Sequence, residues 1–330
     1  MSKAAWLVVN EFLQSGKFNE IHKWLMKAAE KFGINMILKT NAELLVDLQT
    51  KECRKKTEEE DCCFPAAESE LDRSDSMETN SYRKKTRTEE PEFILFWDKD
   101  TRLARHLEQQ GYPVFNSSKA IAACDDKSLT HLALMIAGIP MPRTIVAPMT
   151  FDNIGYTNTD FLKEVSERLG FPMVVKECFG SFGQQVYLAK EPEELKGLVD
   201  RIGTKPMLFQ EFIASSSGRD VRLQVVGSKV IAAMYRYSLN GDFRANLTIG
   251  GKMLPYEPTK EQCELAIRCC EVLGLDYAGV DLLFGEDGTT LVCEVNSNAH
   301  FKNIYDCTGV NAADAILSHI VDKLKVGNIG

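Results

Sequence analysis

The chain of 330 residues contains no long apolar segment. A helix needs about 20 consecutive apolar residues to cross a bilayer, and no run in the sequence approaches that length. The first ten residues also lack the charged, apolar and small-residue order of a secretory signal. We therefore expect no membrane partner and a cytoplasmic location.

An excess of positive charge is also missing. The 39 Lys and Arg residues are outnumbered by 47 Asp and Glu residues, so the net charge is −8. Proteins that bind nucleic acids generally present a basic face to the phosphates. We therefore expect no nucleic-acid partner.

The ten cysteines lack the spacing of a zinc or disulfide framework. No two of them form a Cys-x-x-Cys knuckle, and Cys62–Cys63 and Cys269–Cys270 are adjacent pairs. In a cytosolic chain we expect reduced thiols, several of them packing as small apolar side chains. The neighbours of Cys178 and Cys293 likewise favour packing over catalysis.

Strand and helix patterns alternate along the sequence. The apolar runs 5–9 and 34–38 flank a segment whose apolar residues recur at helical spacing and which Gly33 ends. Such a strand–helix–strand start predicts a mostly parallel sheet. Asp125 or Asp126 and Thr259 are predicted to begin later helices. Further strands are predicted at 92–97, 173–179, 185–189, 207–213, 220–226 and 229–236. The predicted class is α/β, becoming α+β towards the C-terminus.

Residues 51–92 interrupt this pattern. Of these 42 residues 22 are charged, twice the chain average of 26%. Such a segment cannot bury enough apolar surface to offset the entropy of ordering it. We expect a disordered surface insertion, and a regulatory or partner-docking role is the alternative.

The last predicted hairpin, 279–284 with 290–296, carries the sharpest chemical signal. Asp287-Gly288 is typical of a two-residue turn, and such a turn places Asp281 opposite Glu294. Asn296 then projects from the same face. Two facing carboxylates repel each other and are costly to desolvate. A divalent cation with carboxylate and amide ligands would compensate, and magnesium carrying phosphates fits best.

A solvated face is the alternative for this pair. Leu283 and Val292 are expected on the same face and argue against it.

A glycine-bearing turn follows a strand that a lysine interrupts. Lys176 precedes Gly180-Ser181-Phe182-Gly183, whose backbone amides could hold phosphates that the lysine neutralises. No Lys-Ser/Thr follows the glycines, so the turn is not a Walker A loop. Many ordinary hairpins carry Gly-x-x-Gly, so this signal alone is weak.

Two arginine-bearing segments complete the set. Arg219-Asp220-Val221-Arg222 opens a predicted strand, and Arg244 and Asn246 share a face if their segment is extended. The planar fork of arginine suits phosphates and carboxylates. Turn polarity with a surface ion pair is the alternative.

In this order, the motifs resemble the ATP-grasp superfamily, and most closely its RimK-like branch of glutamate and amino-acid ligases. The stretches that carry the resemblance lie between about 125 and 320: Asp126-Lys127, Gly138-Ile139-Pro140-x-Pro142-x-Thr144, Phe171-Pro172-x-Val174-Val175-Lys176 with its glycine turn, Gln210-Glu211-Phe212-Ile213, Gly218-Arg219-Asp220-Val221-Arg222, Asp242-Phe243-Arg244-Ala245-Asn246-Leu247 with Gly250-Gly251, Ala278-Gly279-Val280-Asp281, and Glu294-Val295-Asn296-Ser297.

The resemblance implies an ATP-grasp fold in three parts. These are an N-terminal βαβ pre-ATP-grasp lobe (1–124, containing the insertion 51–92), a small lobe (125–206) and a large lobe with the metal site (207–330). It also implies a carboxylate–amine ligase that forms an acyl phosphate from ATP and then an amide. ATP and a small-molecule or peptide substrate are the implied partners, and a homo-oligomer is compatible with the resemblance.

The resemblance also assigns roles to single residues. Lys127 and Lys176 would contact the nucleotide phosphates, and the loop Gly180, Ser181, Phe182, Gly183 would close over them. Gln210, Glu211, Phe212 and Ile213 would grip adenine, and Asp220 would hold the ribose side. Arg244 and Asn246 would act at the transferred phosphate and the acyl phosphate. Asp281, Glu294 and Asn296 would ligate one or two Mg²⁺ (or Mn²⁺) ions.

The sequence departs from many RimK-like ligases after Asn296. A Ser-Pro-Gly type of turn is replaced by Ser297-Asn298-Ala299-His300-Phe301. His300 could bind a substrate carboxylate or assist amine deprotonation, and a plain turn histidine is the alternative. The other functions we consider are a peptide-modifying ligase of a natural-product pathway and a nucleotide-binding domain without catalysis.

Overall fold

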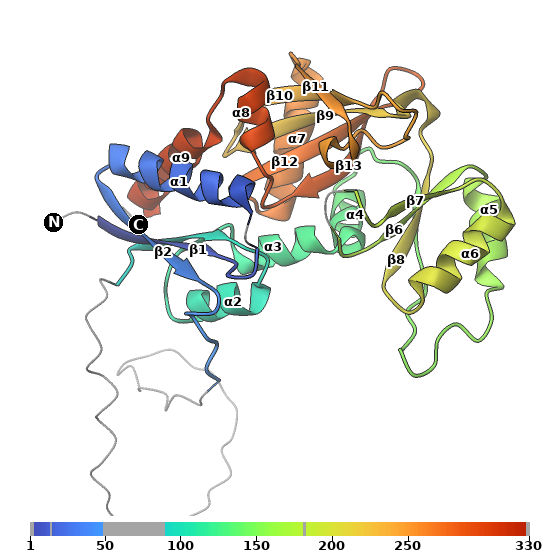
Figure 1. The fold of residues 1–330 in the computed structure, drawn as a ribbon, viewed down its shortest axis with the longest axis horizontal. Coiled ribbons are helices and arrows are strands. Elements are labelled where there is room, and N and C mark those ends of the chain that lie inside the picture. Colours follow the sequence, from blue (N-terminus) through green and yellow to red (C-terminus); the bar gives the residue numbers. More distant parts are fainter. Residues whose placement is uncertain (1–2, 14, 49–89, 181–182, 328–330) are drawn as a thin grey trace, which may run out of the picture.

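The computed structural model describes residues 3–13, 15–48, 90–180 and 183–327 (Figure 1). The predicted insertion 51–92 lies outside the described residues except for its last three. Of these, Pro91 is buried, and the Glu92 amide donates to the Ala4 carbonyl at 2.8 Å. Residues 90–92 therefore belong to the ordered fold and not to the insertion.

The first sheet has the predicted βαβ start. Its strands are β1 (Lys3–Val9), β2 (Ile34–Thr40), β3 (Phe93–Trp97) and β4 (Val114–Phe115), all parallel, in the order β2-β1-β3-β4. Helix α1 (Gly16–Lys31) connects β1 to β2. Because the chain adds β2 on one side of β1 and β3 on the other, the carboxyl ends of β1 and β3 form a topological switch point.

Helices cover both faces of this sheet, since side chains alternate between faces along each strand. Leu7, Leu95 and Trp97 pack against α1 and the C-terminal helix α9 (Ala312–Gly327). Val8 and Phe96 face α2 (Thr101–Gln109) and α3 (Ser118–Asp125).

The second sheet is antiparallel and has its own core. It contains β5 (Thr144–Val146), β8 (Met207–Glu211), β6 (Met173–Glu177) and β7 (Val186–Ala189), in that spatial order. Helices α5 (Phe161–Leu169) and α6 (Pro192–Ile202) pack on it through residues such as Leu195 and Phe209. Helix α4 (Lys127–Ile136) precedes the sheet and begins at the predicted cap Asp126.

The third sheet has the order β11 (Lys252–Pro255), β10 (Lys229–Tyr237), β9 (Arg219–Val226), β12 (Tyr277–Phe284) and β13 (Thr290–Asn296). Helix α7 (Lys260–Leu273), which begins with the predicted capping box of Thr259 and Gln262, packs on one face. The opposite face carries alternate residues of β9 and β12, including Asp220, Arg222 and Asp281. The remaining elements are α8 (Lys302–Thr308) and the short 3₁₀ helices at 214–216 and 247–249.

The final hairpin differs from the prediction near its turn. Phe284 pairs with Thr290, so the loop spans 285–289 and is longer than the two-residue turn at Asp287-Gly288. An irregularity between Asp281 and Leu282 then moves the register by one residue, because Cys293 is an extra residue on β13. Asp281 therefore pairs with Glu294 as predicted, through two deviations that cancel.

The same bulge changes which apolar residues share the Asp281 face. Val292 pairs with Leu282, and both lie in the core beside α7. The expectation that Val292 shares a face with Leu283 is therefore wrong.

The searched residues, which are those the structure describes, include no helix long and apolar enough to cross a membrane.

Candidate active site

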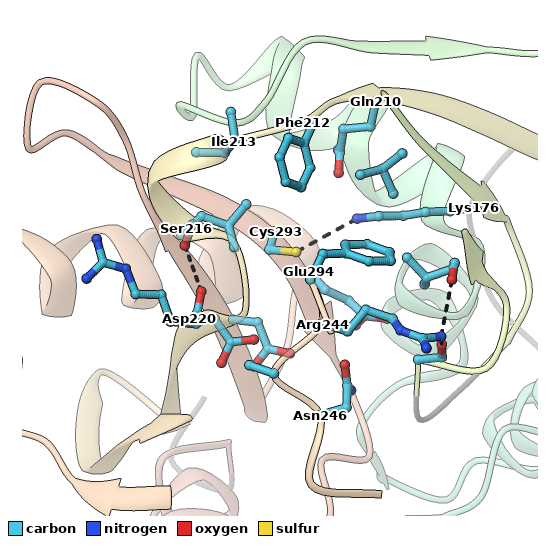
Figure 2. A pocket seen from close by; sticks show the side chains of 18 of the residues that line it. Lys176, Gln210, Phe212, Ile213, Ser216, Asp220, Arg244, Asn246, Cys293 and Glu294 are labelled. Carbon is cyan, nitrogen blue, oxygen red and sulfur yellow. Dashed lines mark hydrogen bonds between the residues drawn. The ribbon is translucent and has the colours of Figure 1, made fainter. Parts of the chain in front are cut away.

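An open cavity lies between the second and third sheets. Figure 2 shows Gln210, Phe212 and Ile213 on one side of it, Asp220 and Ser216 on another, and Arg244 and Asn246 opposite. Thirteen of the predicted site residues line the cavity: Lys127, Lys176, Gly180, Gly183, Gln210, Glu211, Phe212, Ile213, Asp220, Arg244, Asn246, Asp281 and Glu294. Ser181 and Phe182 lie outside the described residues. Asn296 does not line the cavity.

Asp220, Arg236 and Asp281 are buried charged residues that line this cavity, and the half-buried Arg222 lies behind them. Arg222 binds Asp281 through two bonds, Nε–Oδ1 at 2.7 Å and Nη2–Oδ2 at 2.6 Å. Arg236 binds Asp220 in the same forked way at 2.6 and 2.7 Å, and its Nη2 is also 3.1 Å from Asp281 Oδ2. Two arginines and two aspartates thus balance one another across β10, β9 and β12.

This network corrects the expected role of the cation. We expected a metal ion to be needed to offset the facing carboxylates, but Arg222 and Arg236 already compensate Asp281. Burial opposes the charged form of Asp281, yet the two guanidinium groups outweigh it and hold its pKa below the ordinary value. For Asp220, burial is the larger effect and raises the pKa despite Arg236.

Glu294 and Asn296 have fewer polar partners within the protein than Asp281 has. The Glu294 side chain is 31% exposed and lies 3.6 Å from Lys127 Nζ. Asn296 has a buried amide nitrogen with no partner among the described residues. Because amide nitrogen and oxygen exchange places by a simple flip, this position can present an oxygen.

These donors fit a hard divalent cation. The described residues contain no group of three or more His, Cys, Asp and Glu that could hold a metal. Magnesium, however, is commonly bound by one or two carboxylates together with substrate phosphates. Glu294, Asp281 and the Asn296 amide supply that type of ligand set.

Two lysines enter the cavity from different elements. Lys127 lies in the first turn of α4, with Nζ 3.2 Å from the Gly180 carbonyl. Lys176, on β6, has Nζ 3.8 Å from Cys293 Sγ (Figure 2). Because Cys293 is the extra residue of the bulge, it faces the cavity, which the sequence did not indicate. Burial raises the pKa of its thiol, so the neutral form is favoured.

The end of β8 is held by a buried polar chain. Gln210 Nε2 lies 3.0 Å from His131 Nε2 and 2.9 Å from Thr144 Oγ1, and His131 Nδ1 lies 2.7 Å from the Lys127 carbonyl. Burial lowers the pKa of His131 to about 4, so the ring is neutral near pH 7. The His131 Nδ1–H therefore donates to the Lys127 carbonyl oxygen, and His131 Nε2 accepts from Gln210 Nε2.

The glycine turn packs tightly against the segment 242–246. Arg244 donates Nη1 to the Gly183 carbonyl at 2.9 Å while its other donors bind the Asp242 carboxylate. Gly183 has φ of +72°, and a Cβ there would lie 2.8 Å from Asn246 Oδ1. Segment 242–246 is not part of a strand, and Arg244 and Asn246 both reach the cavity.

The sequence alone indicates no role for Arg222, Arg236 or His131. Arg222 belongs to the motif Gly218-Arg219-Asp220-Val221-Arg222, but local sequence does not reveal that β9 pairs with β12 and so brings Arg222 to Asp281. Arg236 and His131 had no local signal, since both act through contacts with distant strands or helices.

Comparisons with known proteins agree on the type of fold. A family model described as a RimK-like ATP-grasp domain matches residues 124–320. Beta-citrylglutamate synthase B of Danio rerio is 34% identical over 228 residues, 69% of this chain and 55% of that protein. A probable alpha-L-glutamate ligase of Xanthomonas euvesicatoria is 36% identical over 228 residues, 68% of this chain and 74% of that protein. The chain therefore spans little more than half the length of the zebrafish relative.

A solved structure extends the likeness to nearly the whole chain. The ATP-grasp ligase PsnB, in complex with a variant of its minimal precursor, Mg and ADP, superposes with a TM-score of 0.62. The match covers 98% of this chain and 99% of PsnB at 16% sequence identity, which supports the shared fold alone.

Proposed function

The chain belongs to the RimK-like ATP-grasp family, and from this premise we propose that it is an ATP-dependent carboxylate–amine ligase. The pairing of Asp281 with Glu294 beside a cavity that also holds Lys127 and Lys176 is the observation that carries the proposal. Anionic phosphates and a divalent cation match those charges. The product is an amide formed by way of an acyl phosphate.

The nucleotide occupies the cavity. Gln210, Glu211, Phe212 and Ile213 hold adenine, mainly through their backbone, and Asp220 lies on the ribose side. Lys127 and Lys176 neutralise the phosphates together with the turn that contains Gly180, Ser181, Phe182 and Gly183. This assignment is supported by the convergence of the described members of the set on one cavity.

Asp281, Glu294 and Asn296 hold Mg²⁺ or Mn²⁺, and two ions per site are proposed. When bound, the metal neutralises charge on the transferred phosphoryl group. Arg222 and Arg236 fix the orientation of Asp281, so this carboxylate is positioned before any ligand arrives.

Catalysis rests on positioning and charge neutralisation. A substrate carboxylate attacks the terminal phosphate of ATP, and an amine then displaces phosphate from the acyl phosphate. Arg244 and Asn246 act at the transferred phosphate, with the Arg244 guanidinium held in place by Asp242 and the Gly183 carbonyl. No nucleophilic side chain is required, and the neutral Cys293 thiol has no part in either step.

We propose an amino acid or a peptide as the substrate, with glutamate the first candidate. Sequence relatives at 34–36% identity carry glutamate in their names. PsnB, crystallised with a peptide precursor, is only 16% identical and supports no particular substrate. A cytoplasmic location, a homo-oligomer and the lobes 1–124, 125–206 and 207–330 complete the proposal. The first sheet lies within 1–124 and the third within 207–330, whereas β8 (Met207–Glu211) of the second sheet extends past the proposed end of the small lobe.

The test measures ADP release with ATP and Mg²⁺ across a panel of amino acids and short peptides. Hydroxylamine is added in a parallel series, because it captures an acyl phosphate as a hydroxamate whether or not the natural amine is present. We expect ADP release that depends on a carboxylate substrate. Tight ATP binding without ADP or hydroxamate from any acid would favour a nucleotide-binding domain without catalysis.

A further inference from the structure

A second group of buried polar atoms lies beside the nucleotide cavity. The described residues contain six buried side-chain nitrogen or oxygen atoms without a partner, and five of them belong to four residues of neighbouring segments: Gln224, Asn296, Asn298 and His300. An unpaired buried polar atom costs about 1–3 kcal/mol, so such a concentration calls for a ligand or for water.

Strand pairing brings Gln224 and Asn296 into one row, and Asn298 and His300 lie in the turn that follows β13; together these residues form one wall. Gln224 pairs with Gly279 and Gly279 pairs with Asn296, one step along the sheet from the Arg222–Asp281–Glu294 row. A Cβ on Gly279 would lie 2.5 Å from Ala299 Cβ, so the turn 297–300 covers this second row. Gln224 is only 1% exposed, and both atoms of its amide lack partners.

The wall meets the switch point of the first sheet. Asn10 follows β1 and Asp98 follows β3, and Asn10 Nδ2 donates to Asp98 Oδ1 at 3.1 Å. Asn298 Nδ2 donates to the Asp98 carbonyl at 2.5 Å. Ligands of open α/β sheets bind outside the carboxyl ends of the strands at such a point.

Asp98 is a buried carboxylate without a cation. It is 5% exposed, its side chain accepts from Asn10 and from the Lys99 amide, and no described lysine, arginine or histidine forms an ion pair with it. Burial raises its pKa, and the nearby acidic residues Asp100 and Asp125 add to the effect. Buried charges are normally paired, so a positive ligand group would relieve this cost.

The neighbouring free atoms suit the same group. Asn298 has an unpartnered amide oxygen, and His300 has an unpartnered Nε2. Burial, with Lys17, Arg222 and Lys302 nearby, lowers the pKa of His300 to about 4, so the ring is neutral near pH 7. Carbonyl oxygen, neutral imidazole nitrogen and carboxylate are all acceptors for an N–H donor.

We propose that this group of polar atoms, between the carboxyl ends of β1 and β3 and the turn after β13, binds the charged amino group of an amino-acid substrate. Asp98 supplies the counter-charge, and Asn298 and His300 accept from the remaining N–H groups. The inference rests on the proposed ligase function and deepens it, since it selects substrates that carry a free ammonium group. It also gives a role to the turn in which the sequence departs from many RimK-like ligases.

The test compares Asp98→Asn with wild type, using the twenty L-amino acids, L-glutamate first, and their N-acetyl derivatives as probes. Binding is measured from the rise in Tm in the presence of ADP and Mg²⁺, followed by titration of any amino acid that raises it. We expect at least one free amino acid, but not its N-acetyl derivative, to raise the Tm of wild type. Asp98→Asn should weaken that binding about tenfold to hundredfold.

Asp100→Asn is the matched control, because it removes a nearby acidic charge while keeping a side chain that caps α2. It should bind the amino acid as wild type does. If Asp98→Asn does not fold, Asn298→Ala removes an oxygen that has no hydrogen-bond partner among the described residues, together with the bond from Nδ2 to the Asp98 carbonyl, and should weaken the same binding.

Two results would overturn the inference: no free amino acid stabilises wild type, or Asp98→Asn still prefers the free amino acid to its N-acetyl form. Failure of the ligase proposal is separate, because it would appear as absent hydroxamate formation in wild type. If these polar atoms hold only structural water, amino-acid affinity should be unchanged in Asp98→Asn, and that result also counts against the inference.

Discussion

Glu294 and Asp281 face each other across two strands, yet their charges are balanced in different ways. Asp281 is 3% exposed and is held by two arginines, whereas Glu294 is partly exposed and, among the described residues, forms an ion pair with Lys127 alone, at 3.6 Å. A buried, paired carboxylate is costly to alter, because its partners would be left as uncompensated charges. Glu294 is therefore the better position at which to separate metal binding from folding.

Glu294→Gln should lower magnesium-dependent ADP release about a hundredfold or more, since metal sites lose about 10–100-fold even from changes behind the ligands. Stability should change little, because the substitution removes a charge that faces Asp281. Glu286→Gln, on the exposed loop of the same hairpin, is the control and should retain activity. Wild-type turnover in Glu294→Gln would refute the metal assignment.

Gly183 combines a positive φ with a close contact, and the two effects can be separated. Gly183→Ala should cost about 1–2 kcal/mol of stability from the left-handed backbone alone. It should also raise the KM for ATP about tenfold or more, because the new Cβ meets Asn246 at 2.8 Å and displaces the turn from Arg244. Gly155→Ala has a similar φ of +69° with open space around it. It should show the stability loss with an unchanged KM, and an equal KM effect in both variants would contradict the contact argument.

At the scale of elements, one buried carboxylate fastens the C-terminal helix to the third sheet. Asp276, just before β12, accepts from His319 Nε2 at 2.9 Å and Lys323 Nζ at 2.6 Å, both on α9. Burial opposes its charged form, but the hydrogen bonds from His319 and Lys323 outweigh burial and lower its pKa.

A carboxyl group whose folded pKa is lowered stabilises the fold above its unfolded pKa, and this contribution is lost as the pH falls through the folded pKa. Asp276→Asn should therefore reduce the free energy of unfolding by about 1–3 kcal/mol near neutral pH. The difference from wild type should shrink below about pH 4, the ordinary range of an aspartate. Urea unfolding of both proteins at several pH values gives the measurement, and a difference that grows in acid would contradict the assigned sign.

How far the sequence predicted the fold depends on whether the signal was local. The βαβ start, the cap Asp126 and the capping box at Thr259 were correct, because each depends on residues within a few positions. The short elements β4, β5, β11, α3 and α8 were missed, since they carry too few residues for a periodic pattern.

The candidate site follows the same division. Its motif residues were identified from the sequence. The Arg222–Asp281–Arg236 network depends on the strand order β10-β9-β12, which cannot be deduced from local sequence patterns. The bulge at Cys293 likewise had no signal in the sequence. One extra residue reverses the facing of every residue beyond it, and here it brings Glu294 and Asn296 to the Asp281 side.

At the scale of the whole molecule, the first and third sheets share one core while the second has its own. Asn116, which follows β4, joins the first sheet to the third. Its side chain accepts from the Asp276 amide and donates to the Tyr277 and Ser297 carbonyls. Trp97, at the end of β3, stacks on Tyr277 of β12 with ring centroids 5.4 Å apart. Described residues also pack on both faces of the first sheet, which contains β2 and β3.

Replacing residues 51–89 with a Gly/Ser linker of about ten residues should leave the Tm within a few degrees. Such a linker, with residues 41–50, can reach back along β2 to the start of β3 at about 3.3 Å per residue. Shortening the connection also slightly lowers the entropy cost of closing it. A large fall in Tm would show that the replaced residues contribute to the packed fold.

The separate core of the second sheet affects how unfolding can be observed. The three tryptophans of the chain are Trp6, Trp24 and Trp97, and all belong to β1, α1 or β3. Tryptophan fluorescence will therefore report unfolding of the first sheet and its neighbours. It will not report loss of structure around β6 and β8. A tryptophan reporter at Phe161 or Phe171, which border the core of that sheet, would make the hidden transition visible.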